Sequence, residues 1–202
     1  MRILTIAVLL LAFAGIAAIV AGGQSAAFDR AVILALRDPS HPLNPIGPAW
    51  VEEAIRDITS LGSVLVALFF SASLAGYLLL AGRKRDAALV LISAVGALLC
   101  NDVLKYFFDR PRPDLALQSL RVFTSGFPSG HAALSAAAYP AMAALFPGIS
   151  NRPVRIYLMT IAVILVLAIG ASRVYLGLHY PTDVLAGWCI GSAWGLICRL
   201  GR

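Results

Sequence analysis

Two histidines and one carboxylate in the second half of the chain have the features of a phosphoryl-transfer site. His179 is followed four residues later by Asp183, a spacing that places both side chains on one face of a helix starting near His179. A carboxylate that bonds one imidazole nitrogen fixes the tautomer and leaves the other nitrogen as a nucleophile. His131 follows Pro-Ser-Gly, in a position suited to protonating a leaving oxygen. Taken singly, each histidine also fits a plainer role, as a helix cap or an interfacial side chain.

Three basic residues accompany the histidines. Lys105 and Arg112 bracket a loop after one apolar segment, and Arg173 ends another. Arginine presents a bidentate fork to phosphate oxygens and lysine adds a compact charge, although each alone also fits an interfacial cation. Ser129 is a suitable helix N-cap, and Gly130 lets backbone N–H groups approach a phosphate at the helix N-terminus. The other charges in these loops are interpreted as loop charges or ion-pair partners: Asp109, Arg110, Asp114 and Arg121.

All these residues lie at the ends of apolar segments, and the composition indicates an integral membrane protein. Of the 202 residues, 60% are hydrophobic and 13% are charged, against about 25% charged in a typical soluble domain. We predict one membrane-embedded unit over residues 1–202, without a separate soluble domain. The net charge of +6 does not indicate nucleic-acid binding, because the basic residues form no continuous stripe. No residue cluster has the spacing of a metal site, so we expect no metal and no other cofactor.

Six apolar stretches predict an all-α fold, a polytopic membrane bundle of six transmembrane helices. The fourth stretch is short and carries Pro140, so we expect it inside the bundle, where neighbouring helices satisfy the freed backbone. The last contains Gly187, Gly191 and Gly195, a small-residue face that lets another helix approach closely. The first stretch also resembles a cleaved signal peptide, but its apolar run is longer than usual for one, so we interpret it as a span. The six stretches cover residues 3–21, 61–81, 87–103, 132–146, 156–171 and 183–200.

Basic residues in short loops predict which side of the membrane each end of the bundle faces. With six spans both termini share one side, together with short basic loops at residues 83–85 and 152–155. Short basic loops favour the cytoplasm, so we expect cytoplasmic termini and a site that faces outward. Residues 22–60 then form an outer-face loop. Within it we predict an interfacial helix over residues 28–37 and a helix over residues 49–60 that runs into the second span.

Taken together, three motifs resemble the signature of the type 2 phosphatidic acid phosphatase superfamily. That signature reads K-x6-R-P, then P-S-G-H, then S-R-x5-H-x3-D. The chain matches each motif in order and at its spacing, within residues 105–183. The matching residues are Lys105, Arg112 and Pro113, then Pro128, Ser129, Gly130 and His131, then Ser172, Arg173, His179 and Asp183.

The resemblance implies metal-free hydrolysis of a lipid phosphate through a phosphohistidine intermediate. It assigns the attack on phosphorus to His179, the orientation of that ring to Asp183, and proton transfer at the leaving oxygen and the water to His131. It implies that the phosphoryl oxygens are bound by Lys105, Arg112, Ser129, Gly130 and Arg173. We expect a membrane lipid as the substrate and a location in a bacterial inner membrane. The oligomeric state is left open.

Four lipid substrates stay open: undecaprenyl diphosphate, phosphatidylglycerophosphate, phosphatidic acid and a lipid A phosphate. The minimal chain, with no added soluble domain, favours the polyprenyl diphosphate. A vanadate-dependent haloperoxidase would use similar residues, but those enzymes are soluble and the six apolar stretches argue against one. An anion or lipid transporter would also carry intramembrane cations, but conduction does not need the two histidines and the carboxylate.

Overall fold

The computed structural model describes residues 1–114, 125–146 and 151–200, and Arg121 lies outside them. Within these residues the chain is helical, and its only β feature is an isolated bridge between Arg37 and Pro45. The predicted all-α fold is therefore confirmed. The helices are α1 (Arg2–Ala21), α2 (Ala26–Ala35), α3 (Ala49–Ser60), α4 (Val64–Leu80), α5 (Lys84–Phe107), α6 (Gly130–Leu145), α7 (Arg152–Tyr175) and α8 (Pro181–Ile197).

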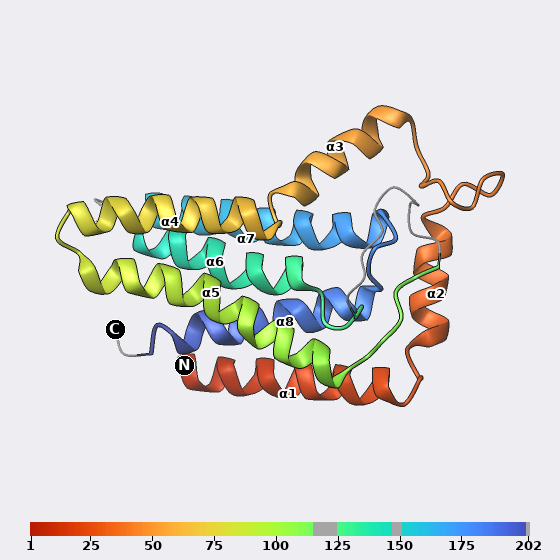
Figure 1. Cartoon of the computed structure of the whole chain (residues 1–202), viewed down its shortest axis with the longest axis horizontal. Coiled ribbons are helices and arrows are strands. Elements are labelled where there is room, and N and C mark those ends of the chain that lie inside the picture. The colour runs from red at the N-terminus through yellow and green to blue at the C-terminus, as the bar shows by residue number, and fades with distance from the viewer. Residues whose placement is uncertain (115–124, 147–150, 201–202) are drawn as a thin grey trace.

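The helices form an elongated bundle with a crosspiece at one end. Helices α1 and α4 to α8 run along the long axis, whereas α2 crosses one end of the bundle and α3 projects away from it (Figure 1). Both termini lie at the end opposite α2 (Figure 1). This placement agrees with an even number of crossings. It also separates the terminal end of the bundle from the end that carries the motif residues.

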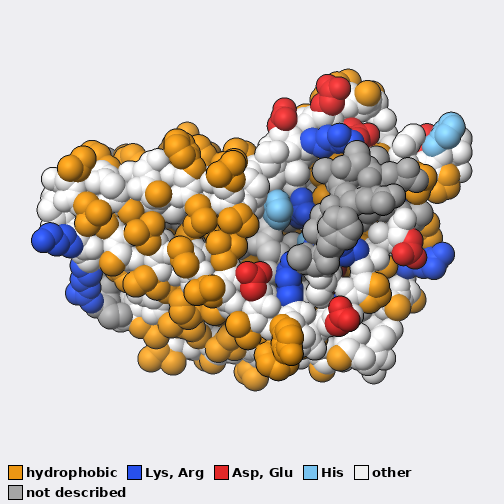
Figure 2. Space-filling view, viewed as in Figure 1, with side chains coloured by type: hydrophobic (Ala, Val, Ile, Leu, Met, Phe, Trp, Pro, Cys, Tyr) orange, Lys and Arg blue, Asp and Glu red, His pale blue; other side chains and the backbone are white. Residues whose placement is uncertain are grey.

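The flank of the bundle has the surface of a membrane protein. Hydrophobic side chains cover the helices between charged groups at the two ends (Figure 2). Among the described residues, α1, α5 and α7 are long and apolar enough to cross a bilayer, and α3 with α4 would add one bent span. Helices α6 and α8 have 16 and 17 residues, fewer than the roughly 20 of a typical span. Three to four spans follow from length and composition, and the six-span topology stays a prediction.

The helix over residues 49–60 does not continue into the second span as expected. The chain breaks between α3 and α4, and the two helix axes differ by 48°. Ser63 starts α4 as its N-cap, with its hydroxyl accepting from the backbone N–H of Val66 at 3.3 Å. The Tyr139 hydroxyl of α6 donates to the carbonyl of Leu61. The break is therefore held by side chains of both α4 and α6.

Close contact between α6 and α8 forms the centre of the bundle. Helix α6 is rich in alanine and buried along most of its length, as the sequence predicts for a helix inside the bundle. The small-residue face of α8 lies directly on it, with Gly191 against the backbone of Ala133 and Gly187 against the carbonyl of Ser129. Any Cβ at these two glycines would collide with backbone atoms of α6. This contact holds the N-terminal ends of α6 and α8 at one end of the bundle.

Candidate active site

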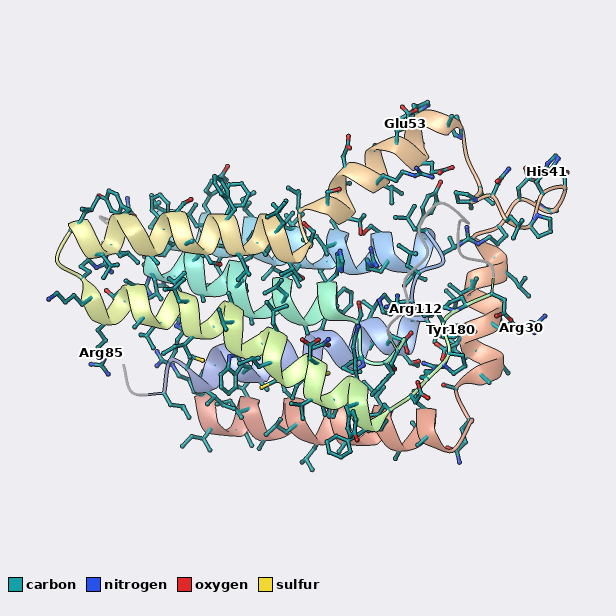
Figure 3. The ribbon with its side chains drawn as sticks, in the orientation of Figure 1. Arg30, His41, Glu53, Arg85, Arg112 and Tyr180 are labelled. Carbon is teal, nitrogen blue, oxygen red and sulfur yellow. The ribbon has the colours of Figure 1, made fainter. Side chains whose placement is uncertain are left out.

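The eight predicted site residues converge at the end of the bundle that α2 crosses. Lys105 lies in the last turn of α5, His131 in the first turn of α6, and Arg173 in the last turn of α7. The charges of Lys105, Arg112 and Arg173 act on both histidines. Figure 3 shows Arg112 near Tyr180, beside α2. Residues from four separate helices and two loops therefore share one site.

A glycine turn after α7 places His179 in this site. Gly177 has a φ of 70°, a left-handed conformation that costs glycine little and other residues more. The N–H of Leu178 then bonds the carbonyl of Arg173 at 3.0 Å and closes the helix end. The His179 side chain is 1% exposed. The turn thus buries the histidine among the cations.

Hydrogen bonds set the tautomer of His179. Its Nδ1 lies 2.8 Å from the carbonyl oxygen of Gly126, so Nδ1 carries the proton and donates. Its Nε2 lies 3.1 Å from Nη1 of Arg112 and accepts from it. Burial lowers the pKa of His179 well below its usual range, and the charges of Arg173, Arg112 and Lys105 lower it further. A neutral ring with an Nε2 lone pair directed at a guanidinium is suited to attack an anion bound there.

Asp183 reaches His179 in a way that the sequence did not predict. Helix α8 begins at Pro181 with Tyr180 as its N-cap, two residues later than expected, so His179 precedes the helix and shares no helical face with Asp183. Asp183 Oδ2 instead accepts from the backbone N–H of Tyr180 at 2.8 Å and completes a capping box. It lies 3.6 Å from Nδ1 of His179. At this distance the carboxylate acts on the ring through its charge rather than a hydrogen bond.

Several buried polar atoms in the site have no hydrogen-bond partner among the described residues. They include the hydroxyl of Ser129, Nε of Arg173 and Oδ1 of Asn101. Burying such groups is costly unless they are satisfied. Oxygens of a bound phosphoryl group would accept from the hydroxyl and the guanidinium. These residues therefore fit an anion site.

Ser129 and Gly130 hold the start of α6 against two neighbouring elements. Ser129 is the N-cap residue, as predicted, but its side chain makes no capping bond, and its backbone N–H donates to the carbonyl of Asp183 at 3.0 Å. A Cβ at Gly130 would lie 3.2 Å from Nδ2 of Asn101. Asn101 was missed by the sequence analysis, although it lies one helical turn before Lys105. The signal that could have identified Asn101 is a polar residue inside an apolar helix, four positions before the cation Lys105.

Arg110 is an ion-pair partner, one of the two interpretations given above, but the sequence analysis did not place it in the site. It donates to the carboxylates of Asp183 and Asp29. In an extended segment, residues two apart face the same side. The two-residue spacing from Arg112 is therefore the signal that could have placed Arg110 beside the site.

Comparison with known proteins agrees with this geometry. Residues 86–201 match the model of the PAP2 superfamily. The chain belongs to this superfamily. It is 33% identical over 146 residues to a phosphatidylglycerophosphatase B of Bacillus subtilis, covering 70% of each chain. It is 32% identical over 184 residues to a lipid A 1-phosphatase of Rhizobium etli, covering 77% of this chain and 75% of the relative.

A solved structure extends the agreement to nearly the whole PAP2 chain. The transmembrane PAP2-type phosphatidylglycerolphosphate phosphatase of Bacillus subtilis superposes with a TM-score of 0.82 at 27% identity, over 96% of this chain and 94% of that one. Family, fold and apolar helices together identify the protein as an integral membrane phosphatase.

Proposed function

We propose that this PAP2 protein hydrolyses a phosphate ester or diphosphate on a membrane lipid, without a metal, through a phosphohistidine on His179. One observation carries the proposal. His179 is buried, a setting that lowers its pKa and favours the neutral ring, and its Nε2 lies 3.1 Å from Nη1 of Arg112. A phosphoryl group bound by Arg112 would therefore lie next to the attacking nitrogen.

The reaction would proceed in two steps. In the first, Nε2 of His179 attacks phosphorus and the bond from phosphorus to the lipid oxygen breaks. His131, which would be protonated once the bound phosphoryl anion offsets the nearby cations, gives its proton to that oxygen. In the second, His131 takes a proton from water, the hydroxide attacks phosphorus, and the nitrogen–phosphorus bond breaks to release phosphate. Lys105, Arg112 and Arg173 stabilise the charge that spreads over the phosphoryl oxygens in both steps.

An apolar groove beside the site supports a lipid substrate. The groove has a volume of about 760 Å³ and lies between α4, α6 and α7, with Leu61 and Leu165 among its lining residues. Leu61 precedes Gly62, and a Cβ at Gly62 would lie 3.2 Å from the ring of His131. The lining continues along α4 from Phe70 to Tyr77, a helical distance of about 10 Å. A lipid tail in this groove would leave its phosphate next to His131.

The proposal includes a six-span topology with the site at the outer face of a bacterial inner membrane. The position of both termini opposite α2 supports an even number of spans (Figure 1). The basic loops around residues 83–85 and 152–155 lie on the terminal side in that topology, which favours a cytoplasmic location for it. Helices α6 and α8 cross as short helices that are largely surrounded by protein.

The identity of the lipid head group is the part of the substrate assignment that stays open. The two sequence relatives named above are phosphatases for different lipids, at nearly equal identity. The structural likeness to a phosphatidylglycerolphosphate phosphatase covers almost the whole chain. We therefore place phosphatidylglycerophosphate first among the four candidates, ahead of the polyprenyl diphosphate.

A phosphate-release assay on the detergent-solubilised protein tests the proposal. The four candidate lipids are compared in the presence of excess chelator and, separately, of vanadate, which mimics five-coordinate phosphorus. We expect release from at least one lipid, unaffected by chelator and inhibited by vanadate. No release from any lipid would favour a transporter, and loss on chelation that a divalent ion restores would refute the metal-free mechanism.

A further inference from the structure

We propose that Asp29 and Arg110 position the catalytic carboxylate, so that α2 is a working part of the active site. The proposal rests on the phosphohistidine mechanism proposed above and on the role that the family resemblance implies for Asp183, the orientation of His179. Asp29 lies on α2, outside the segment that matches the PAP2 family model. We call Asp29, Arg110 and Thr182 the carboxylate clamp.

The guanidinium of Arg110 bridges two carboxylates that are 0% exposed. Its Nη1 donates to Oδ1 of Asp183 at 2.5 Å, and its Nη2 donates to Oδ2 of Asp29 at 2.8 Å. A buried carboxylate needs a counter-ion, and removing that partner leaves an uncompensated charge. Arg110 also lies over the ring of Tyr180, with its Cζ 4.6 Å from the ring centroid. One arginine therefore bridges both buried acids and packs on the residue that caps α8.

Thr182 closes the clamp at the first turn of α8. Its hydroxyl donates to Oδ2 of Asp29 at 2.7 Å and accepts from Nη1 of Arg110 at 2.9 Å. Its backbone N–H, one of the free donors at the helix N-terminus, bonds Oδ1 of Asp29 at 3.1 Å. Asp29 therefore supplies, from another helix, an acceptor for the start of α8.

These contacts hold the Asp183 carboxylate in one orientation, with Oδ2 toward His179. Arg110 engages Oδ1, while Oδ2 is held by the backbone N–H of Tyr180 and faces His179 at 3.6 Å. With both oxygens held, the carboxylate cannot rotate away from the imidazole. Both Nη atoms of Arg110 bond carboxylates of the chain. Arg110 is therefore a positioning residue, in contrast to Arg112, whose Nη1 reaches the histidine itself.

Variants of the clamp should lower kcat and leave substrate affinity unchanged. We expect Asp29→Asn and Arg110→Gln to reduce kcat about 10- to 100-fold, by analogy with residues that orient the ligands of a metal site. KM and the inhibition constant for vanadate should stay at the wild-type values. Arg110→Lys keeps the charge but not the fork that bridges two acids, so its kcat should fall between those of Arg110→Gln and the wild type.

Matched controls and a milder variant separate positioning from loss of fold. Arg30 and Glu53 are exposed, on α2 and α3 (Figure 3), so Arg30→Gln and Glu53→Gln should leave kcat unchanged. If Asp29→Asn and Arg110→Gln fail to fold in detergent, the milder variant is Thr182→Val, which keeps the charges of Asp29, Arg110 and Asp183. It should still fold and lower kcat to a smaller extent. Wild-type kcat in Asp29→Asn, or a weaker vanadate affinity that matches the loss of rate, would overturn the clamp. Absence of phosphate release in the wild type would instead refute the proposed function.

Discussion

Two interfaces of helix α6 differ in how closely their partner helices approach. On one side α8 lies against α6 with glycine on backbone, as Gly191 does on Ala133. On the other side α4 and α7 leave the apolar groove of about 760 Å³ over the same helix. On the α8 side, Gly187 and Gly191 therefore leave no space for a Cβ, whereas the side that faces α4 and α7 has room for a lipid chain.

The difference matches what each interface has to do. In a bilayer, apolar burial does not drive helices together, so close packing of small residues supplies the attraction. The α6–α8 contact brings the backbone N–H of Ser129 within 3.0 Å of the carbonyl of Asp183, which fixes the two catalytic helix ends to each other. In the groove, the Tyr139 hydroxyl bonds the Leu61 carbonyl at one end, and the remaining space is open. The helices are closely packed where the phosphoryl group would react and separated where the tail would lie.

The largest effect is expected from the two histidines, at the end of the bundle where α6 and α8 are in close contact. His179→Ala should abolish turnover of every substrate, because no phosphoenzyme can form. His131→Ala should lower turnover of a lipid phosphate about 10²- to 10⁴-fold, the usual value of general acid catalysis. An activated aryl phosphate needs little protonation of its leaving group, so it should partly restore the first step in His131→Ala alone. The measurement is kcat for both substrates in both variants, and rescue of His179→Ala would contradict the assignment.

A bulky residue in the α6–α8 contact should cost stability as well as activity. Gly191→Leu places a side chain against the backbone of Ala133, and overpacking of this kind costs roughly 1–3 kcal/mol or more. We expect a lower thermal midpoint in detergent and little remaining phosphatase activity. Gly76→Leu, at an open position of α4, is the matched control and should behave like the wild type. Equal midpoints for the two variants would remove the contrast between the interfaces.

Narrowing the groove should affect only substrates with long tails. Leu74 lines the groove, so Leu74→Trp should raise KM for a long-chain lipid phosphate. A rise of roughly 10-fold would correspond to a loss of about 1.4 kcal/mol of binding free energy. Hydrolysis of a water-soluble aryl phosphate should be unchanged. Leu99 on α5 is 61% exposed and does not line the groove, which makes Leu99→Trp the control. An equal rise in KM for the aryl phosphate would refute the groove as the tail site.

The smallest effect is expected from pH. An imidazole with an ordinary pKa of about 6.5 would be half protonated, and inactive as a nucleophile, at that pH. Burial and neighbouring cations lower the pKa of His179, so the ring stays neutral as the pH falls through that range. We expect the His179 imidazole, followed by NMR as the pH falls, to stay neutral from neutral to mildly acidic pH. Half protonation of this ring near the ordinary histidine pKa would contradict the assignment.

The sequence predicts contacts that depend on local spacing better than contacts between distant segments. The all-α fold, the burial of α6 and the glycine face of α8 followed from periodicity and composition. The eight predicted site residues lie together at one end of the bundle. The break at Leu61–Ser63 depends on Tyr139 and Ile169, which belong to other helices. The bond from Arg110 to Asp29 joins residues 81 positions apart, and nothing in the spacing of either indicates it. The start of α8 was misplaced because Tyr180 and Asp183 form a capping box that excludes His179 from the helix.

Trapping the phosphoenzyme tests the central claim most directly. The purified protein is mixed with a substrate labelled on its phosphate and quenched with alkali within the first turnover, since a phosphohistidine survives alkali and is lost in acid. We predict alkali-stable, acid-labile label on the wild type and on Asp29→Asn, and none on His179→Ala. Label that persists on His179→Ala, or a wild type that releases phosphate without ever carrying label, would contradict the account.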